Sequence, residues 1–223
     1  MVAVPSWRVE PARRSGRWIA YRQTASDNAP LFHSAGERTP SQRSGRWHRR
    51  GERYAQYLAL EPAGAWAELI RFEAIRGGAR SSEYVRRLWI IVVDETEIAD
   101  LSTFNDYGAC GIDPRLAVGE HDDAQSLADE LLNAGFRGVI SPNAALPGAT
   151  NLTLFDERYE KVLLTGFTTW RNPDPTRRLA CHLVAECGPP IDLITQTCHV
   201  GMPHDAYREH VRDAARATPR RAP

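Results

Sequence analysis

Residues 44–71, SGRWHRRGERYAQYLALEPAGAWAELIR, decide the fold of this chain. The glycines at 45 and 51 predict a turn, and the apolar side chains within residues 54–60 predict a strand directly after it. Pro62 fits the first turn of a helix over residues 63–75, because a proline at that position loses no hydrogen bond. A turn, a short strand and a helix in so short a stretch indicate a domain that mixes helices and strands.

The rest of the chain continues this alternation, with polar loops between the elements. Strands are predicted over residues 17–24, 54–60, 87–93, 136–141, 152–155, 160–164 and 180–186, and helices over residues 63–75, 123–134 and 207–217. Residues 23–53 form a long polar loop, which in a compact domain is usually a binding element. The acidic residues within 94–100 predict a solvated loop after a strand. The predicted fold class is α+β, with mixed sheets of short strands and flanking helices.

The length of 223 residues suits one domain with tails. Residues 1–16 are rich in Pro, Ser and Arg and predict a loose N-terminal arm. Residues 17–165 are expected to form the domain itself. Residues 166–223 are expected to be a C-terminal extension packed on that domain, with a final helix and a basic tail.

The charge balance excludes some classes of partner. Lys and Arg together number 28, as do Asp and Glu, so the formal net charge is zero. Direct binding of nucleic acid or of a membrane surface needs a strongly basic face, which this balance argues against. A low net charge also weakens repulsion between copies and is compatible with a homodimer. No apolar run approaches the roughly 20 residues that cross a bilayer and no secretory signal is visible, so we expect a cytoplasmic protein.

A metal site is the first alternative to consider, because cysteines and histidines gather near the C-terminus. They are Cys181, His182, Cys187, Cys198, His199 and His204. Structural zinc sites use close cysteine pairs, and the gap between Cys181 and Cys187 is too long for such a pair. Buried reduced cysteines and solvated histidines explain the set more simply, so we expect no metal and no prosthetic group.

Three other segments carry residues suited to catalysis or binding. Arg22 ends a predicted strand, and its planar guanidinium can hold a pyrophosphate in two places. The turn at residues 45–48 offers Trp47 for stacking and His48 as a group that titrates near neutral pH. Glu68 lies within the predicted helix, where Arg71 is one turn away and can pair with it. The simpler alternatives are a solvated arginine, a turn with one core tryptophan, and a solvated helix glutamate.

In this order the segments resemble the core of the RES-domain family. In that family a strand arginine, a GGRWN-like turn, a tyrosine-bearing strand and a helix glutamate follow one another. Residues 135–155, GFRGVISPNAALPGATNLTLF, resemble the family's third block, a strand ending in Pro-Ser followed by an Asn-Leu-x-Leu-Phe strand. The resemblance runs from about Trp18 to Phe155, and the order of several blocks makes it specific.

The resemblance implies a catalytic set of arginine, glutamate and serine, which correspond here to Arg22, Glu68 and Asn143. Asn143 departs from the family pattern because it has no hydroxyl. Ser141 lies two residues earlier, on the same face if the strand continues, and can partly substitute for it. Two smaller departures are Ser44 in place of the first glycine of the turn and His48 in place of its asparagine.

The resemblance further implies a fold similar to that of ADP-ribosyltransferases and an action on NAD as substrate. Glu68 would stabilise the positive charge that develops on the ribose when the nicotinamide bond breaks. Arg22, assisted by Arg46, would hold the pyrophosphate or an attacking inorganic phosphate. Trp47 and Tyr57 would form an aromatic wall, and His48 or Asn143 would fix the nicotinamide amide or the ribose.

These roles describe an NAD-degrading enzyme, an NAD+ phosphorylase or a glycohydrolase-like enzyme. Many characterised members of the family are toxins of toxin–antitoxin pairs, which implies a helix-turn-helix antitoxin as partner. Two alternatives stay open at this point. One is a binding module that keeps NAD recognition but has lost turnover with the serine-to-asparagine change. The other is a protein ADP-ribosyltransferase.

Overall fold

The computed structural model describes residues 5–25, 30–31, 44–75, 85–155, 160–163 and 178–217. The strands are β1 (Ala12–Thr24), β2 (Ala55–Ala59), β3 (Arg86–Asp100), β4 (Gly138–Pro142), β5 (Thr150–Phe155), β6 (Glu160–Leu163) and β7 (Arg178–Cys187). The helices are α1 (Pro62–Ile75), α2 (Phe104–Cys110), a 3-10 turn η2 (Pro114–Ala117), α3 (His121–Asn133), α4 (Ile191–Gln196) and α5 (Asp205–Ala217). The predicted mixture of helices and strands is confirmed.

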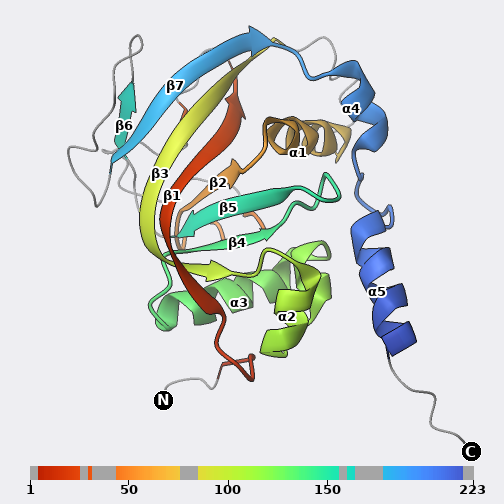
Figure 1. The fold of residues 1–223 in the computed structure, drawn as a ribbon. Helices are drawn as coiled ribbons and strands as arrows, with labels where there is room; N and C mark the ends of the chain where they lie inside the picture. The colour runs from red at the N-terminus through yellow and green to blue at the C-terminus, as the bar shows by residue number, and fades with distance from the viewer. Residues whose placement is uncertain are drawn as a thin grey trace, which may run out of the picture.

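The strands form one mixed sheet that closes on itself. Their order is β1-β2-β5-β4-β3-β7-β6, and a further pairing of β1 with β3 joins the first five into a small barrel. The pairs β3–β4 and β6–β7 are parallel, and the other pairs are antiparallel. Strand β7, which belongs to the predicted C-terminal extension, therefore lies in the same sheet as the barrel strands (Figure 1).

The prediction of a solvated acidic loop over residues 94–100 is wrong, because β3 continues through it to Asp100. Three of the four acidic side chains are matched by arginines on β1, and the fourth, Glu95, pairs with Arg137. Arg17 lies 2.6 Å from Asp94, Arg14 lies 3.4 Å from Asp100, and Arg13 pairs with Glu97. Ile98 and Ala99 are both fully buried, Ile98 in the barrel cluster and Ala99 in the cluster beside α2 and α3, so this part of the strand is covered on both faces.

The same pairing corrects the prediction of a loose arm over residues 1–16. Residues 12–16 belong to β1, where Ala12 pairs with Asp100 and Gly16 with Glu95. Their apolar content is too low to predict a strand. Their partners on β3 supply the charges and hydrogen bonds that order them.

Three apolar clusters hold the layers together. One fills the barrel interior and includes Leu58, Ile91, Ile140 and Leu152. A second lies between the sheet and the helices α2 and α3, and a third lies between the sheet and the helices α1 and α4. In Figure 1 α1 crosses one side of the sheet, α2 and α3 cover one end of the barrel, and α5 runs beside them. Neighbouring residues of one strand, such as Val139 and Ile140, thus serve different cores.

Two helices follow the predicted signals closely. Helix α1 begins at Pro62, and α3 is followed by Gly135 in a left-handed conformation with φ 88°. Helix α2 was not predicted, although its start carries a capping box in which Thr103 and Asp106 bond each other's backbone. Among the described residues, no helix is long and apolar enough to cross a membrane.

The strand β4 is packed so tightly against its neighbours that a substitution of Gly138 tests the packing of the barrel. A Cβ atom on Gly138 would lie 2.4 Å from the carbonyl oxygen of Thr153 and 3.0 Å from Cδ1 of Ile98. We expect Gly138→Ala to lower the free energy of unfolding by about 1–3 kcal/mol through overpacking, measured by denaturant unfolding. The control is Gly108→Ala in α2, where a Cβ meets nothing within 4 Å. Because alanine favours helix, this control should gain up to about 1 kcal/mol. Equal stabilities for the two variants would contradict the close packing.

Candidate active site

Helix α1 places Glu68 against the sheet because its other buried side chains anchor it there. Trp66, Leu69 and Ile70 are at most 3% exposed and pack with Ala59 of β2. Gly64, one turn before Glu68, allows the helix to approach closely, since a Cβ there would lie 2.9 Å from Nδ2 of Asn143. The glutamate is thereby brought to the ends of β4 and β5.

The carboxylate of Glu68 is half-buried and lies among donors and cations. Nδ2 of Asn151 donates to its Oε1 over 3.2 Å. Burial raises the pKa of Glu68, and this effect is opposed by the Asn151 hydrogen bond and by the positive charges of Arg71 and Arg46. A glutamate with a raised pKa among fixed cations is typical of sites where charge develops during a reaction.

The two arginines near Glu68 are held by backbone carbonyls. Nη1 of Arg46 donates to the carbonyl oxygens of Leu116 and Gly119, each at 2.9 Å. Nη1 of Arg71 donates to those of Ala144 and Cys198, at 2.7 and 2.8 Å. Because carbonyls carry no full charge, the positive charge of both arginines remains available to the carboxylate and to an anionic ligand.

The turn at residues 45–48 is organised around the hydroxyl of Tyr57. The N–H of Trp47 donates to this hydroxyl over 2.9 Å, and Nδ1 of His48 lies 2.9 Å from it. Gly45 must lack a side chain, since a Cβ there would lie 2.5 Å from the same oxygen. Burial raises the pKa of Tyr57, so its hydroxyl remains protonated at neutral pH.

Gln125 of α3 fixes the other side of this turn. Its Nε2 donates to the carbonyl oxygens of Gly45 and His48, at 2.8 and 3.2 Å. The residue is 5% exposed and lies on the buried face of α3 between Ala124 and Leu127. A glutamine within the apolar stripe of a helix is the sequence signal for this contact, and Gln125 was not among the predicted site residues.

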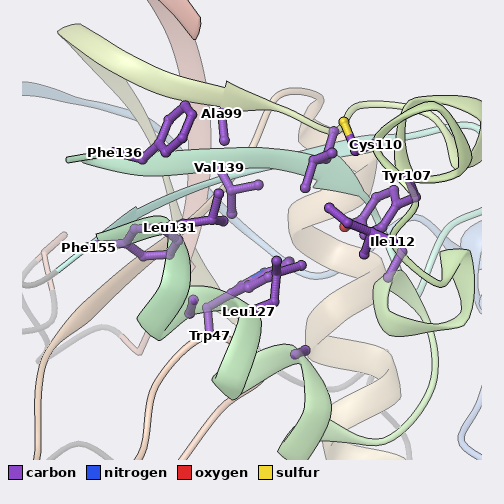
Figure 2. Close-up of a cluster of buried hydrophobic side chains, with 14 of the residues drawn as sticks. Trp47, Ala99, Tyr107, Cys110, Ile112, Leu127, Leu131, Phe136, Val139 and Phe155 are labelled. Carbon is purple, nitrogen blue, oxygen red and sulfur yellow. The ribbon is translucent and has the colours of Figure 1, made fainter. Parts of the chain in front are cut away.

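The ring of Trp47 belongs to a core. It is 2% exposed and lies 6.4 Å from the ring of Phe155. Figure 2 shows it among the packed side chains of this cluster, close to Leu127 of α3. Tyr57, by contrast, is partly exposed and lies close enough to Glu68 for the charge of the glutamate to affect its pKa.

Arg22, on β1, and Glu68, on α1, approach opposite faces of β2. It donates to Oε1 of Gln56 over 2.9 Å, and Gln56 shares the barrel-facing side of β2 with Leu58. Glu68 instead meets Asn151, which pairs with Ala59 on the side facing α1. Burial lowers the pKa of Arg22 to about 10, which leaves it charged at neutral pH. A joint role for Arg22 and Glu68 therefore stays a prediction.

Asn143 is connected to Glu68 through the side chain of Asn151. Its Nδ2 donates to Oδ1 of Asn151 over 2.8 Å, and its own Oδ1 accepts from the N–H groups of Ala145 and Leu146. Ser141 is 2% exposed and pairs with Asn151 across the two strands, so both side chains share one face. The structure therefore brings together Glu68, Asn143 and Ser141, with Arg46, Tyr57 and His48 adjoining them.

The cysteines and histidines near the C-terminus have separate surroundings. Cys181 lies in the barrel core, Cys198 lies near Arg71, and His204 packs on Phe104. Within the described ranges, no group of three or more His, Cys, Asp or Glu residues is arranged to hold a metal ion.

A comparison with family models agrees with the blocks around this site. The RES domain model matches residues 5–180, which is most of the chain. The chain belongs to the RES domain family. The match includes Arg46, Glu68, Arg71, Asn143 and Asn151.

One relative of this RES chain is a protein of Mycobacterium tuberculosis (strain ATCC 25618 / H37Rv) named probable NAD(+) phosphorylase Rv3189. The two are 32% identical over 117 residues, which make up 52% of this chain and 55% of that protein. The similarity thus spans only about half of the relative's length.

A solved structure shares the fold of this RES domain. A chain of the crystal structure of the M. tuberculosis MbcT–MbcA toxin–antitoxin complex superposes with a TM-score of 0.56. The match covers 82% of this chain and 90% of that chain at 19% identity. At that identity the likeness shows a common fold.

The Tyr57 hydroxyl supports the turn, and its removal tests that arrangement. We expect Tyr57→Phe to lower the free energy of unfolding by about 1–3 kcal/mol, because the N–H of Trp47 loses its buried acceptor. Thermal or denaturant unfolding measures this change. The control is Tyr207→Phe, which keeps the ring contact with Phe104. Its hydroxyl makes no hydrogen bond within the described part of the chain. A loss no larger in Tyr57→Phe than in this control would contradict the role of the hydroxyl.

Proposed function

We propose that this RES domain cleaves the nicotinamide–ribose bond of NAD. The observation that carries the proposal is the half-buried carboxylate of Glu68, held by Asn151 between the charges of Arg46 and Arg71. The name of the 32% identical relative, a probable NAD(+) phosphorylase, supports NAD as the substrate.

The chemistry requires a carboxylate of this kind. As nicotinamide leaves, the anomeric carbon of the ribose acquires positive charge, which an adjacent carboxylate stabilises. Glu68 takes this role and orients the ribose hydroxyls. The nucleophile is an oxygen of inorganic phosphate or of water, and the product is ADP-ribose carrying a phosphate or a hydroxyl at that carbon. Phosphorolysis is the version that the relative's name favours.

The other site residues bind the substrate. Arg46 supplies positive charge toward the pyrophosphate or the attacking phosphate, and Arg22 grips the pyrophosphate if the ligand reaches the barrel-facing side of β2. Tyr57 offers a ring to the nicotinamide, and His48 supports that ring through its hydroxyl. Ser141 contributes the hydroxyl that Asn143 lacks.

The biological setting that we propose is a toxin–antitoxin pair. The support is the common fold with a chain of the MbcT–MbcA toxin–antitoxin complex. The partner would be a helix-turn-helix antitoxin protein, and a homodimer remains compatible with the zero net charge.

A second candidate is an NAD-binding module without turnover. The observation that favours it is Asn143, whose amide oxygen and nitrogen are both engaged by protein groups, where the family has a serine hydroxyl. Calorimetry that detects NAD binding without release of nicotinamide would identify this alternative. ADP-ribose attached to a protein, with little free product, would instead identify a protein ADP-ribosyltransferase.

Glu68→Gln tests the enzymatic proposal directly. Purified protein with NAD and phosphate should release nicotinamide, and the variant should do so at least about 100-fold more slowly, because it loses the charge that stabilises the transition state. The matched control is Glu209→Gln, an exposed position of α5, and it should retain the full rate. Equal rates for wild type and Glu68→Gln, or no loss of NAD, would refute the proposal.

The raised pKa of Glu68 predicts how the rate depends on pH. The ionised carboxylate is the active form, so kcat/KM should fall as the pH drops through the pKa of Glu68. Because burial raises that pKa, the decline should begin above the usual range of a glutamate. A profile of NAD consumption between pH 4 and pH 9 measures it. A rate that stays constant down to the ordinary pKa range of a glutamate would argue against ionised Glu68 as the group that catalysis requires.

A further inference from the structure

The side chains of Asn143, Asn151 and Glu68 form a chain of hydrogen bonds that has only one possible direction. It starts at the backbone, where the N–H groups of Ala145 and Leu146 point at one atom of Asn143, at 2.8 and 2.9 Å. A backbone N–H can only donate, so that atom is the amide oxygen. The other end of the Asn143 amide is therefore the nitrogen, which can only donate.

The orientation of the Asn143 amide determines the orientation of the Asn151 amide. Because Asn143 donates, the atom of Asn151 that lies 2.8 Å away is its oxygen. The nitrogen of Asn151 must then face Glu68, where it lies 3.2 Å from Oε1. The orientation of both amides thus follows from the backbone of the turn after β4.

The residues around Asn143 fix the position of this series of hydrogen bonds. Asn143 is fully buried, and its N–H and C=O groups are bound by the carbonyl of Ala149 and by Nε2 of His204, at 2.8 and 3.1 Å. The N–H of Tyr207 donates to Nδ1 of His204, so the proton lies on Nε2 and is donated to Asn143. Gly64 leaves room for the Asn143 amide where any side chain would collide with it.

We propose that Asn151 is a positioning residue for Glu68, and that Asn143 sets the direction in which Asn151 donates. This inference rests on the proposed function only for its catalytic consequence. Asn143 then acts through Asn151, where the family pattern suggested a direct replacement for a serine. Asn151 itself was not predicted, although it opens the Asn-Leu-x-Leu-Phe strand.

Other charged and titratable groups also face Glu68, and Asn151 differs from them in how it acts on the carboxylate. Arg71 approaches from α1 itself, Arg46 from the turn at residues 45–48, and Tyr57 from β2. His121 and His204 lie near the two arginines. The arginines favour the ionised carboxylate through charge alone, whereas Asn151 binds one particular oxygen and fixes the rotation of the carboxylate.

The first measurement does not need enzymatic activity. The carboxyl carbon of Glu68 is followed by NMR against pH, with its signal assigned by its absence in Glu68→Gln. Asn151→Leu removes the donor at similar volume. Asn143→Asp keeps the acceptor for Ala145 and Leu146 but reverses the Asn151 amide. Both should raise the pKa of Glu68 by about one unit, the size of a hydrogen bond to a charged group.

Thr153→Val is the matched control. Thr153 lies two residues after Asn151 on the same face of β5, and its hydroxyl makes no hydrogen bond within the described residues. The titration of Glu68 should be unchanged in this variant. Since Asn143→Asp adds a charge and Asn151→Leu does not, a rise in both variants is required. If Asn151→Leu does not fold, Asn151→Ala, which also lacks a donor, replaces it.

The second measurement is the pH profile of NAD consumption. At neutral pH both variants should be at least about tenfold slower, and their acid limbs should move upward together with the titration of Glu68. An unchanged Glu68 titration in either variant would overturn the positioning role, whatever the rates. Wild-type protein that consumes no NAD would overturn the proposed function, while the titration would still decide the role of Asn151.

Discussion

The pairing of β1 with β3 is the constraint on which the rest of the structure depends. It runs from Ala12 opposite Asp100 to Thr24 opposite Arg87 and turns an open sheet into a barrel. With the barrel closed, each of its strands has an inner face toward the barrel core and an outer face. The outer face next to α1 carries the site, because β2 and β5 present Tyr57 and Asn151 there.

The long pairing is stabilised by different forces along its length. Near Ile91 and Ala20 the side chains fill the barrel core, where burial of apolar area dominates. Toward Asp100 the side chains of β1 are exposed, and its arginines face acidic residues of β3. Exposed ion pairs contribute little stability individually, so this outer part depends on the inner one. The buried part of the pairing therefore orders the charged part.

The arrangement of the site is explained by the groups that stabilise the partly buried carboxylate of Glu68. Burial raises the pKa of Glu68, and three groups act against this effect: Asn151, Arg71 and Arg46. Each is held by a separate segment, since Arg46 binds the carbonyls near η2 and Arg71 binds those after β4 and α4. The carboxylate thus lies where several elements meet, and its ionisation depends on their joint packing.

The sequence by itself determined the elements that have strong local signals. The strand around Tyr57, the helix that begins at Pro62 and the end of α3 before Gly135 could all be predicted, because periodicity, proline and glycine act locally. The order of these blocks also indicated the family. Glu68 and Tyr57 were among the candidate residues that these blocks indicated, and their roles stay predictions.

Only the tertiary structure decided which of the candidates meet. It placed Trp47 in a core, set Arg22 on the barrel-facing side of β2, and joined Asn143 to Glu68 through Asn151. It also made a strand of residues 94–100, whose acidic side chains resemble a loop until the arginines of β1 are beside them. The physical reason is the same in each case. The face that a side chain occupies and the partner that it meets depend on strand register and closure between distant segments, which no local pattern contains.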